Sequence, residues 1–145
     1  MDPAPALLFY DRDCRFCVWG VVGLARRSRP GALALATLQG PLGDAHLGHL
    51  PRDAREASWH LWDGERLRSE ADVLDGLAPR IATPALRLAL QAARLAPRPL
   101  ASAAYRCLAA RRVAASRLVP GAWKARARGT LPALSAPGDD GPRGA

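Results

Sequence analysis

The sequence has few cysteines and no long apolar run, and each of these scarcities excludes a class of protein. Three cysteines in 145 residues are too few, and of the wrong parity, for a framework of structural disulfides. The longest apolar stretch, residues 18–25, is far shorter than the ~20 residues that a membrane-spanning helix needs. The first residues lack the basic and apolar regions of a signal peptide. We therefore expect a soluble protein of a reducing compartment, the cytoplasm.

The chain carries a net charge of +8, and arginine supplies nearly all of its basic residues. The arginines are densest between Arg80 and Arg128, where the pattern is helical, so we interpret them as the solvated face of helices. An acidic partner or a membrane surface is the alternative for this segment. Nucleic-acid binding is not expected, because aromatic residues that stack on bases are not interleaved with the arginines.

The first 80 residues have the pattern of a βαβ unit followed by a hairpin and a helix. The predicted elements are a strand over 7–10, a helix over 14–28, a strand over 33–38, a short helix over 53–57, a hairpin of 58–62 with 65–68, and a helix over 70–77. Asp13 is the expected N-cap of the first helix, Asp63-Gly64 a two-residue turn, and Ser69 with Asp72 a capping box. This order predicts a thioredoxin-like α/β domain of the minimal, glutaredoxin-like kind.

Beyond Pro79 the pattern is helical only, with alanine- and leucine-rich segments over 84–95 and 99–118. From Gly129 onward, prolines, glycines and two aspartates predict a disordered tail. The expected division of the chain is a thioredoxin-like core over 6–80, a helical extension over 81–128 packed on or beside the core, and a tail over 129–145.

Cys14 and Cys17 stand three residues apart, between the first strand and the first helix. A thiolate at a helix start is stabilised by unpaired N–H groups and by the helix dipole, and a second cysteine one turn on can resolve a mixed disulfide. We therefore predict a redox dithiol in which Cys14 attacks and Cys17 resolves. Arg15 is expected to lower the pKa of Cys14, whereas Asp11 and Asp13 should raise it, and either aspartate could relay a proton to Cys17.

A zinc-binding or redox-sensing module is the alternative use of this pair. His46 and His49, also three residues apart, could supply the other two ligands of a metal. However, 28 residues separate the two pairs, and the cysteines open a helix instead of occupying a knuckle of turns. A second alternative is a binding module made of the basic helices.

Other residues near the pair are candidates for its surroundings. Tyr10, Phe16 and Trp19 are expected to line the dithiol pocket, since Phe16 lies between the cysteines and the other two lie close to them in sequence. Cys107 lies in an apolar helical stretch and is expected to be a buried, inert thiol. We assign no metal and no cofactor beyond the redox-active disulfide itself.

Residues 8–17, Leu-Phe-Tyr-Asp-Arg-Asp-Cys-Arg-Phe-Cys, resemble the opening of the DCC family, small predicted thiol-disulfide oxidoreductases named for an Asp-Cys-Cys signature. The family pattern is an apolar strand ending in Tyr-Asp and followed by x-Asp-Cys-x-x-Cys. Its fixed positions are Tyr10, Asp11, Asp13, Cys14 and Cys17 in this chain. Looser likeness continues to about residue 115 and includes Tyr105-Arg106 and Ala110-Arg111-Arg112.

The resemblance implies a thioredoxin-like fold, a Cys14–Cys17 redox pair, disulfide-containing substrates, and a thiol that donates or accepts electrons. Many members carry proline after the first cysteine, where this chain has Arg15, so a reduction potential does not transfer. The proline that thioredoxins place opposite the dithiol is also missing before Ser58, and the nearest one upstream is Pro51. Substrate docking is therefore expected to differ from that of thioredoxin.

Overall fold

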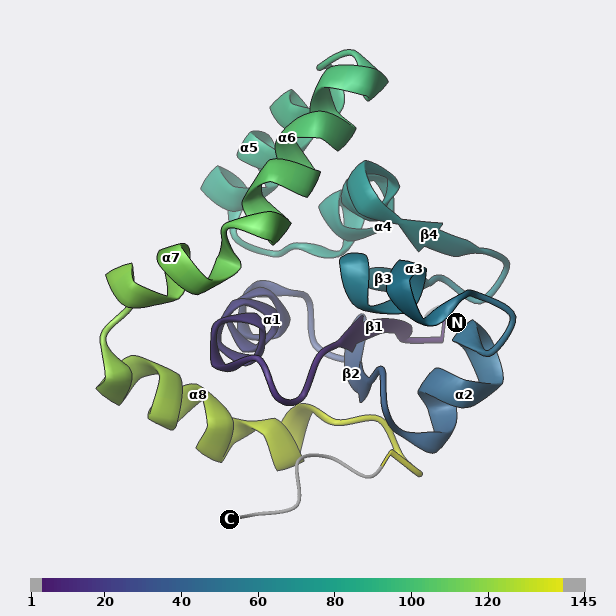
Figure 1. Cartoon of the computed structure of the whole chain (residues 1–145), viewed down its shortest axis with the longest axis vertical. Helices are drawn as coiled ribbons and strands as arrows, with labels where there is room; N and C mark the ends of the chain where they lie inside the picture. The colour runs from purple at the N-terminus through teal and green to yellow at the C-terminus, as the bar shows by residue number, and fades with distance from the viewer. Residues whose placement is uncertain (1–3, 140–145) are drawn as a thin grey trace.

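A computed structural model describes residues 4–139, in which helices cover both faces of a four-stranded sheet (Figure 1). Its elements are β1 (Ala6–Tyr10), α1 (Arg15–Arg27), β2 (Leu33–Thr37), α2 (Pro41–Leu47), α3 (Arg52–Ala57), β3 (His60–Trp62), β4 (Leu67–Ser69), α4 (Val73–Leu77), α5 (Pro84–Arg94), α6 (Arg98–Ala110), α7 (Arg112–Leu118) and α8 (Gly121–Leu134). Short 3-10 turns precede and follow α4.

The sheet has the strand order β2-β1-β3-β4. β1 pairs with β2 in parallel, as a βαβ unit requires, and with β3 antiparallel, so it is a central strand. Its residues are almost wholly buried, as a continuous apolar strand predicts. Together with the hairpin of β3 and β4, this arrangement confirms the predicted thioredoxin-like α/β fold with a helical extension.

The alternation of side chains along β1 divides the core between the two faces of the sheet. Leu8 and Tyr10 belong to the cluster that α1 and α8 cover, where Val18 and Val21 are also buried. Phe9 points to the opposite face and packs in a second cluster with residues of β2 and α2. The strand therefore leads, through residues 11–14, to the N-terminus of α1 beside the larger core.

The chain from Gly121 to Asp139 is a structural part of the fold, so the predicted tail is wrong for residues 129–139. α8 packs along α1 and buries Ala127 and Leu131 in the larger core cluster. Gly129 favoured the tail prediction because glycine weakens a helix, but contact with α1 outweighs that weakness. Residues 140–145 of the predicted tail lie outside the described residues.

The chain after α8 is tied to the edge strand β2. The Ala136 amide donates a hydrogen bond to the Leu35 carbonyl (2.7 Å). The Asp139 carboxylate accepts hydrogen bonds from the Thr37 amide (3.0 Å) and from the Thr37 hydroxyl (3.2 Å). These contacts join two segments about a hundred positions apart in the sequence, so no local sequence pattern could predict them.

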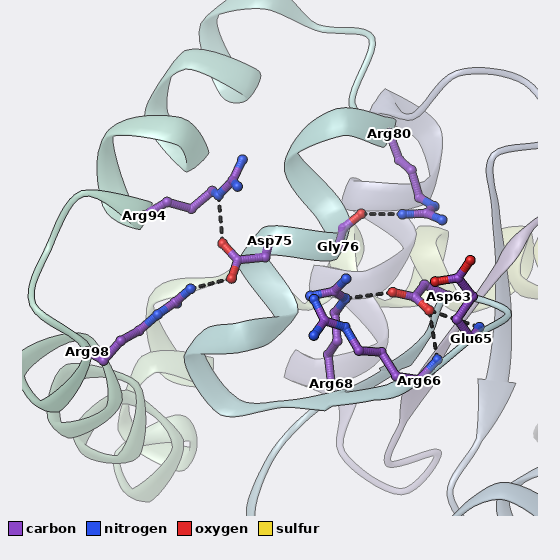
Figure 2. Close-up of polar contacts among 9 residues, drawn as sticks. All are labelled: Asp63, Glu65, Arg66, Arg68, Asp75, Gly76, Arg80, Arg94 and Arg98. Atoms are coloured by element: carbon purple, nitrogen blue, oxygen red, sulfur yellow. Dashed lines mark hydrogen bonds and ion pairs between the residues drawn. The ribbon is translucent and has the colours of Figure 1, made fainter.

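The connection between β3 and β4 is longer than the two-residue turn predicted from Asp63-Gly64. Pairing resumes only at Leu67, so residues 63–66 form the loop. The Asp63 carboxylate accepts hydrogen bonds from the Glu65 amide (3.1 Å) and from Arg68 Nε (2.7 Å), as Figure 2 shows. The Asp63 amide also donates a hydrogen bond to the Arg66 carbonyl (3.3 Å), so both the backbone and the side chain of this aspartate stabilise the loop.

The predicted capping box at Ser69 is also wrong. The Ser69 hydroxyl lies 2.6 Å from Nδ1 of the buried His60 and makes no cap contact. Residues 70–72 form a 3-10 turn, and α4 begins only at Val73. The Ser69 hydroxyl therefore contacts the buried His60 imidazole across the strands and does not cap a helix.

The extension begins with three helices, α5 to α7, none of which contains a buried residue. α5 and α6 project from the sheet in Figure 1, and the predicted helix over 99–118 is divided at Arg111 into α6 and α7. Asp75 of α4 is ion-paired with both Arg94 and Arg98 (Figure 2), which holds the projecting pair to the core. No helix in the described part of the chain has the length and apolar character needed to cross a bilayer.

Candidate active site

The dithiol lies where β1 turns into α1. The Asp11 side chain accepts a hydrogen bond from the Asp13 amide (3.0 Å), and its carbonyl accepts one from the Cys14 amide (3.3 Å). These bonds complete a turn over residues 11–14, and α1 begins just after it. The N-cap is therefore Cys14, not the predicted Asp13, and its Sγ accepts the Cys17 amide at 3.2 Å.

Cys14 is partly exposed and its thiol is unusually acidic. The Cys17 thiol donates a hydrogen bond to Sγ, burial opposes the charge, and the Cys17 amide and the positive charge of Arg112 favour it. Asp11 acts in the opposite direction, as predicted. The sum lowers the pKa of Cys14 to about 6, so the thiolate predominates at neutral pH.

Cys17 is buried, with 6% of its surface exposed, and its thiol is held protonated. The hydrogen bond that it donates to Cys14 raises its pKa far above the usual value, and burial and the negative charge of Cys14 raise it further. The two thiols of the pair thus have opposite protonation preferences, with the charge on Cys14 and the proton on Cys17.

Asp11 is fixed in place by a residue that follows β2. Gln39 Nε2 donates a hydrogen bond to Asp11 Oδ1 (2.8 Å), and Gln39 Oε1 accepts one from the Arg12 amide (3.3 Å). Asp11 also lines a pocket together with Cys17. Asp13, by contrast, is exposed.

A pocket of about 170 Å³ adjoins the dithiol on the side of Cys17. Most of its wall is aromatic or aliphatic. Its lining residues include Phe16, Trp19 and Gly20 of α1, Ala57, Ser58 and Trp59 before β3, and Tyr105, Leu108, Ala109 and Arg112 of α6 and α7. The core and the extension therefore build this pocket jointly.

The wall contributed by α6 and α7 was not predicted from the sequence. The Tyr105 hydroxyl accepts a hydrogen bond from the Trp59 amide (2.7 Å), which fixes α6 against the segment before β3. Arg112 lies at the start of α7, close enough to the dithiol for its charge to act on both cysteines. The one available signal was the Tyr105-Arg106 and Arg111-Arg112 likeness to the DCC pattern, which carries no spatial information.

The structure brings some predicted site residues together and separates others. Phe16 and Trp19 line the pocket with Cys17. Tyr10 does not, because it is fully buried in the core below α1. Arg15 is exposed and lines a separate cavity between α1 and α8, so Arg112 is the cation that acts on the thiols.

Two further expectations for cysteine and histidine can be compared with the structure. Cys107 is exposed on α6, so its prediction as a buried thiol is wrong. It faces away because Tyr105 and Leu108 turn the other side of the helix toward the pocket. His46 packs between the rings of Phe9 and Trp62, and no group of three or more metal-binding side chains occurs within residues 4–139.

A family model described as DCC1-like thiol-disulfide oxidoreductase matches residues 8–118. The chain belongs to this family. The match begins in β1, includes the dithiol and ends with α7, so it covers both walls of the pocket. Membership identifies the protein as a thiol-disulfide oxidoreductase, with disulfide substrates and thiol redox partners in general. Neither the curated proteins nor the solved structures contain a match to the chain.

Proposed function

We propose that this DCC1-like protein exchanges disulfides through a Cys14–Cys17 dithiol cycle in which Cys14 is the nucleophile. The observation that carries the proposal is the contrast between the two thiols. Cys14 is accessible and has a pKa of about 6, whereas Cys17 is buried and has a raised pKa. Attack on a disulfide requires an accessible thiolate, as at Cys14, and resolution begins from a protonated neighbouring thiol, as at Cys17.

The cycle transfers two electrons from the dithiol to the substrate. The Cys14 thiolate attacks one sulfur of a substrate disulfide, the substrate S–S bond breaks, and the first substrate thiolate leaves and takes a proton from water. Cys17 then loses its proton and attacks Cys14 Sγ, which releases the second substrate thiol and leaves a Cys14–Cys17 disulfide. A thiol reductant closes the cycle by reducing that disulfide and becoming oxidised itself, so no further cofactor is needed.

Asp11 is the proposed acceptor of the Cys17 proton. Once Cys14 is in the mixed disulfide, it carries no charge and no longer accepts the Cys17 thiol, so the hydrogen bond and the negative charge that raise the Cys17 pKa disappear, and burial is the main cause that remains. Asp11 lines the same pocket as Cys17, and both of its described side-chain hydrogen bonds use Oδ1. We assign the proton to Oδ2, and we give no such role to the exposed Asp13.

Turnover of bis(2-hydroxyethyl) disulfide with excess dithiothreitol tests the cycle. Cys14→Ser should lose catalysis, and Cys17→Ser should accumulate a mixed disulfide on Cys14 that mass spectrometry detects. Cys107→Ser is the matched control and should behave as wild type, because Cys107 lies outside the pocket. Full activity in Cys14→Ser would overturn the proposal. Asp11→Asn should slow release of the second thiol by about 10-fold or more.

A further inference from the structure

The pocket beside the dithiol is larger than the exchange chemistry itself requires. Attack and resolution involve three sulfur atoms in a line, which the exposed end of α1 can accommodate without a cavity. The pocket adds about 170 Å³ of space with an aromatic and aliphatic wall. An apolar cavity of about 150 Å³ is known to hold benzene, so this space has the size of one ring.

Close packing gives this pocket a defined shape. A Cβ atom at Gly20 would lie 3.0 Å from the end of the Trp59 indole, so glycine lets that ring lie directly against α1. The Tyr105 hydroxyl accepts the Trp59 amide and fixes the opposite wall (2.7 Å). Phe16 and Trp19 have ring centroids 5.7 Å apart on the α1 side. Aromatic walls of this kind favour an apolar, ring-shaped ligand.

The pocket lies close enough to Cys14 for a bound ligand to carry the sulfur that reacts. Cys17 is part of the wall and its thiol touches Cys14, so the pocket begins one side chain away from the nucleophile. We propose that the pocket binds a ring-sized apolar group joined by a short linker to the substrate sulfur that Cys14 attacks. This inference rests on the proposed dithiol cycle and names its substrate class.

The position also decides which sulfur of an unsymmetrical disulfide is attacked. With the ring in the pocket, the Cys14 thiolate attacks the sulfur that carries the ring. The bond between the two substrate sulfurs breaks, and the other half leaves as a thiolate that takes a proton from water. Resolution by Cys17 then releases the ring-bearing thiol.

Two matched substrates test the inference: benzyl 2-hydroxyethyl disulfide and bis(2-hydroxyethyl) disulfide. Each kcat/KM is divided by the rate constant of the same disulfide with dithiothreitol, which removes differences in intrinsic reactivity. Burial of one phenyl ring should favour the benzyl substrate by about 10- to 100-fold. In Cys17→Ser, the trapped adduct should carry the benzylthio group, not the hydroxyethylthio group.

A pocket-filling variant supplies the structural control. Ala109→Phe places a ring in the pocket and should reduce the benzyl preference to within about 3-fold of unity. Ala103→Phe makes the same change at an exposed position of α6 outside the pocket and should retain the preference. Each variant is judged by a ratio of two rates on one sample, so partial unfolding of a variant does not mimic the expected loss.

A second substrate pair distinguishes a small-molecule disulfide from a peptide. It consists of the mercaptoethanol mixed disulfides of acetyl-Phe-Cys-amide and acetyl-Ala-Cys-amide. A preference of about 10-fold in either pair supports the inference, and the pair that shows it identifies the source of the ring. Turnover of all four substrates at equal normalised rates would overturn the inference but leave the dithiol cycle intact. Failure to turn over any of them would overturn both.

Discussion

At the scale of single residues, two cysteines within one helical turn have opposite protonation preferences. Their difference arises from a shared hydrogen bond, in which Cys17 donates to Cys14. The helix start adds the Cys17 amide at 3.2 Å, and Arg112 adds a positive charge from the extension. The low pKa of Cys14 therefore arises partly from groups of α1 itself and partly from the charge of Arg112, a residue about a hundred positions further along the chain.

Replacing Arg112 tests how much its charge contributes to the low pKa of Cys14. Arg112→Gln removes a charge that favours the thiolate, so the pKa of Cys14 should rise from about 6 toward the ordinary cysteine range. The rate of alkylation by iodoacetamide in Cys107→Ser protein, measured from pH 4 to 10, reports this pKa directly. The midpoint should move upward in the variant.

The control for this experiment is Arg111→Gln, which removes the same charge from the neighbouring position. Arg111 is exposed and does not line the pocket, so the alkylation midpoint should move less than in Arg112→Gln. Equal midpoints in wild type and Arg112→Gln would contradict the assignment of Arg112 as the cation of the site.

At the scale of helices and strands, α8 illustrates how a segment with a weak local signal becomes part of the core. It contains Gly129 and Pro132, yet it buries Leu131 completely against α1 and the sheet. Burial of this side chain and the contacts of Ala136 and Asp139 with β2 supply the stability that the local sequence lacks.

Leu131→Ala should therefore destabilise the protein by about 2–5 kcal/mol, because it removes a fully buried side chain and leaves a cavity. Leu118→Ala, at a position that is 86% exposed, should change stability by less than about 0.5 kcal/mol. Urea unfolding of the reduced proteins measures both values. Equal effects of the two substitutions would show that residues 121–134 do not contribute to the core.

Asp75→Asn should loosen the attachment of α5 and α6. Burial disfavours the charged carboxylate, but hydrogen bonds from Arg94 and Arg98 outweigh it and lower the pKa of Asp75. Loss of two partly exposed ion pairs should cost about 1 kcal/mol and increase amide exchange in both helices. In wild type the same contribution is present above the ordinary carboxyl pKa of about 4 and is lost as the pH falls through the lowered folded value.

Asp72→Asn is the matched control for this change. Asp72 makes a single, longer contact with Arg98 (3.4 Å) and is more exposed, so exchange in α5 should stay at the wild-type rate. Similar exchange in wild type and Asp75→Asn would contradict a clamping role for Asp75.

The sequence predicted those elements whose pattern is local. The continuous apolar run of β1, the helical spacing of α1 and the alternation in the hairpin each predicted their element, and the structure confirms these elements with shifts of a few residues. Predictions failed where a distant partner decides the outcome. Ser69 bonds to His60 instead of capping a helix, and Gly129 lies inside a helix that α1 stabilises.

The residues of the candidate active site likewise fall into those that local sequence predicts and those that distant packing places. Cys14, Cys17 and Asp11 were predicted because the turn and helix start that position them are continuous in the sequence. Arg112 and Tyr105 were not predicted as site residues, since the packing of α6 and α7 on the segment before β3 decides their place.

At the scale of the whole molecule, we expect the core and the extension together to set the reduction potential of the Cys14–Cys17 pair. Stabilising the Cys14 thiolate stabilises the reduced protein, which raises the reduction potential. Dithiol proteins whose nucleophilic cysteine has a pKa of about 7 or about 3.5 have potentials of about −270 and −120 mV. With a Cys14 pKa of about 6, we expect an intermediate potential nearer the first value.

Equilibration with glutathione buffers measures this potential. Arg112→Gln should lower it, because the thiolate loses a favourable charge and the reduced form loses stability. A wild-type potential well below −270 mV, or one unchanged by the substitution, would contradict the link between the extension and the dithiol.

Peptide mapping shows directly whether substrate disulfides are reduced by formation of a Cys14–Cys17 disulfide. Arg15 lies between the two cysteines, so trypsin separates them into the peptides 13–15 and 16–26. After reaction with one equivalent of bis(2-hydroxyethyl) disulfide, mass spectrometry should find these two peptides joined by a disulfide and Cys107 still reduced. Recovery of both peptides as free thiols, or of Cys14 or Cys17 joined to Cys107, would contradict the proposed Cys14–Cys17 cycle.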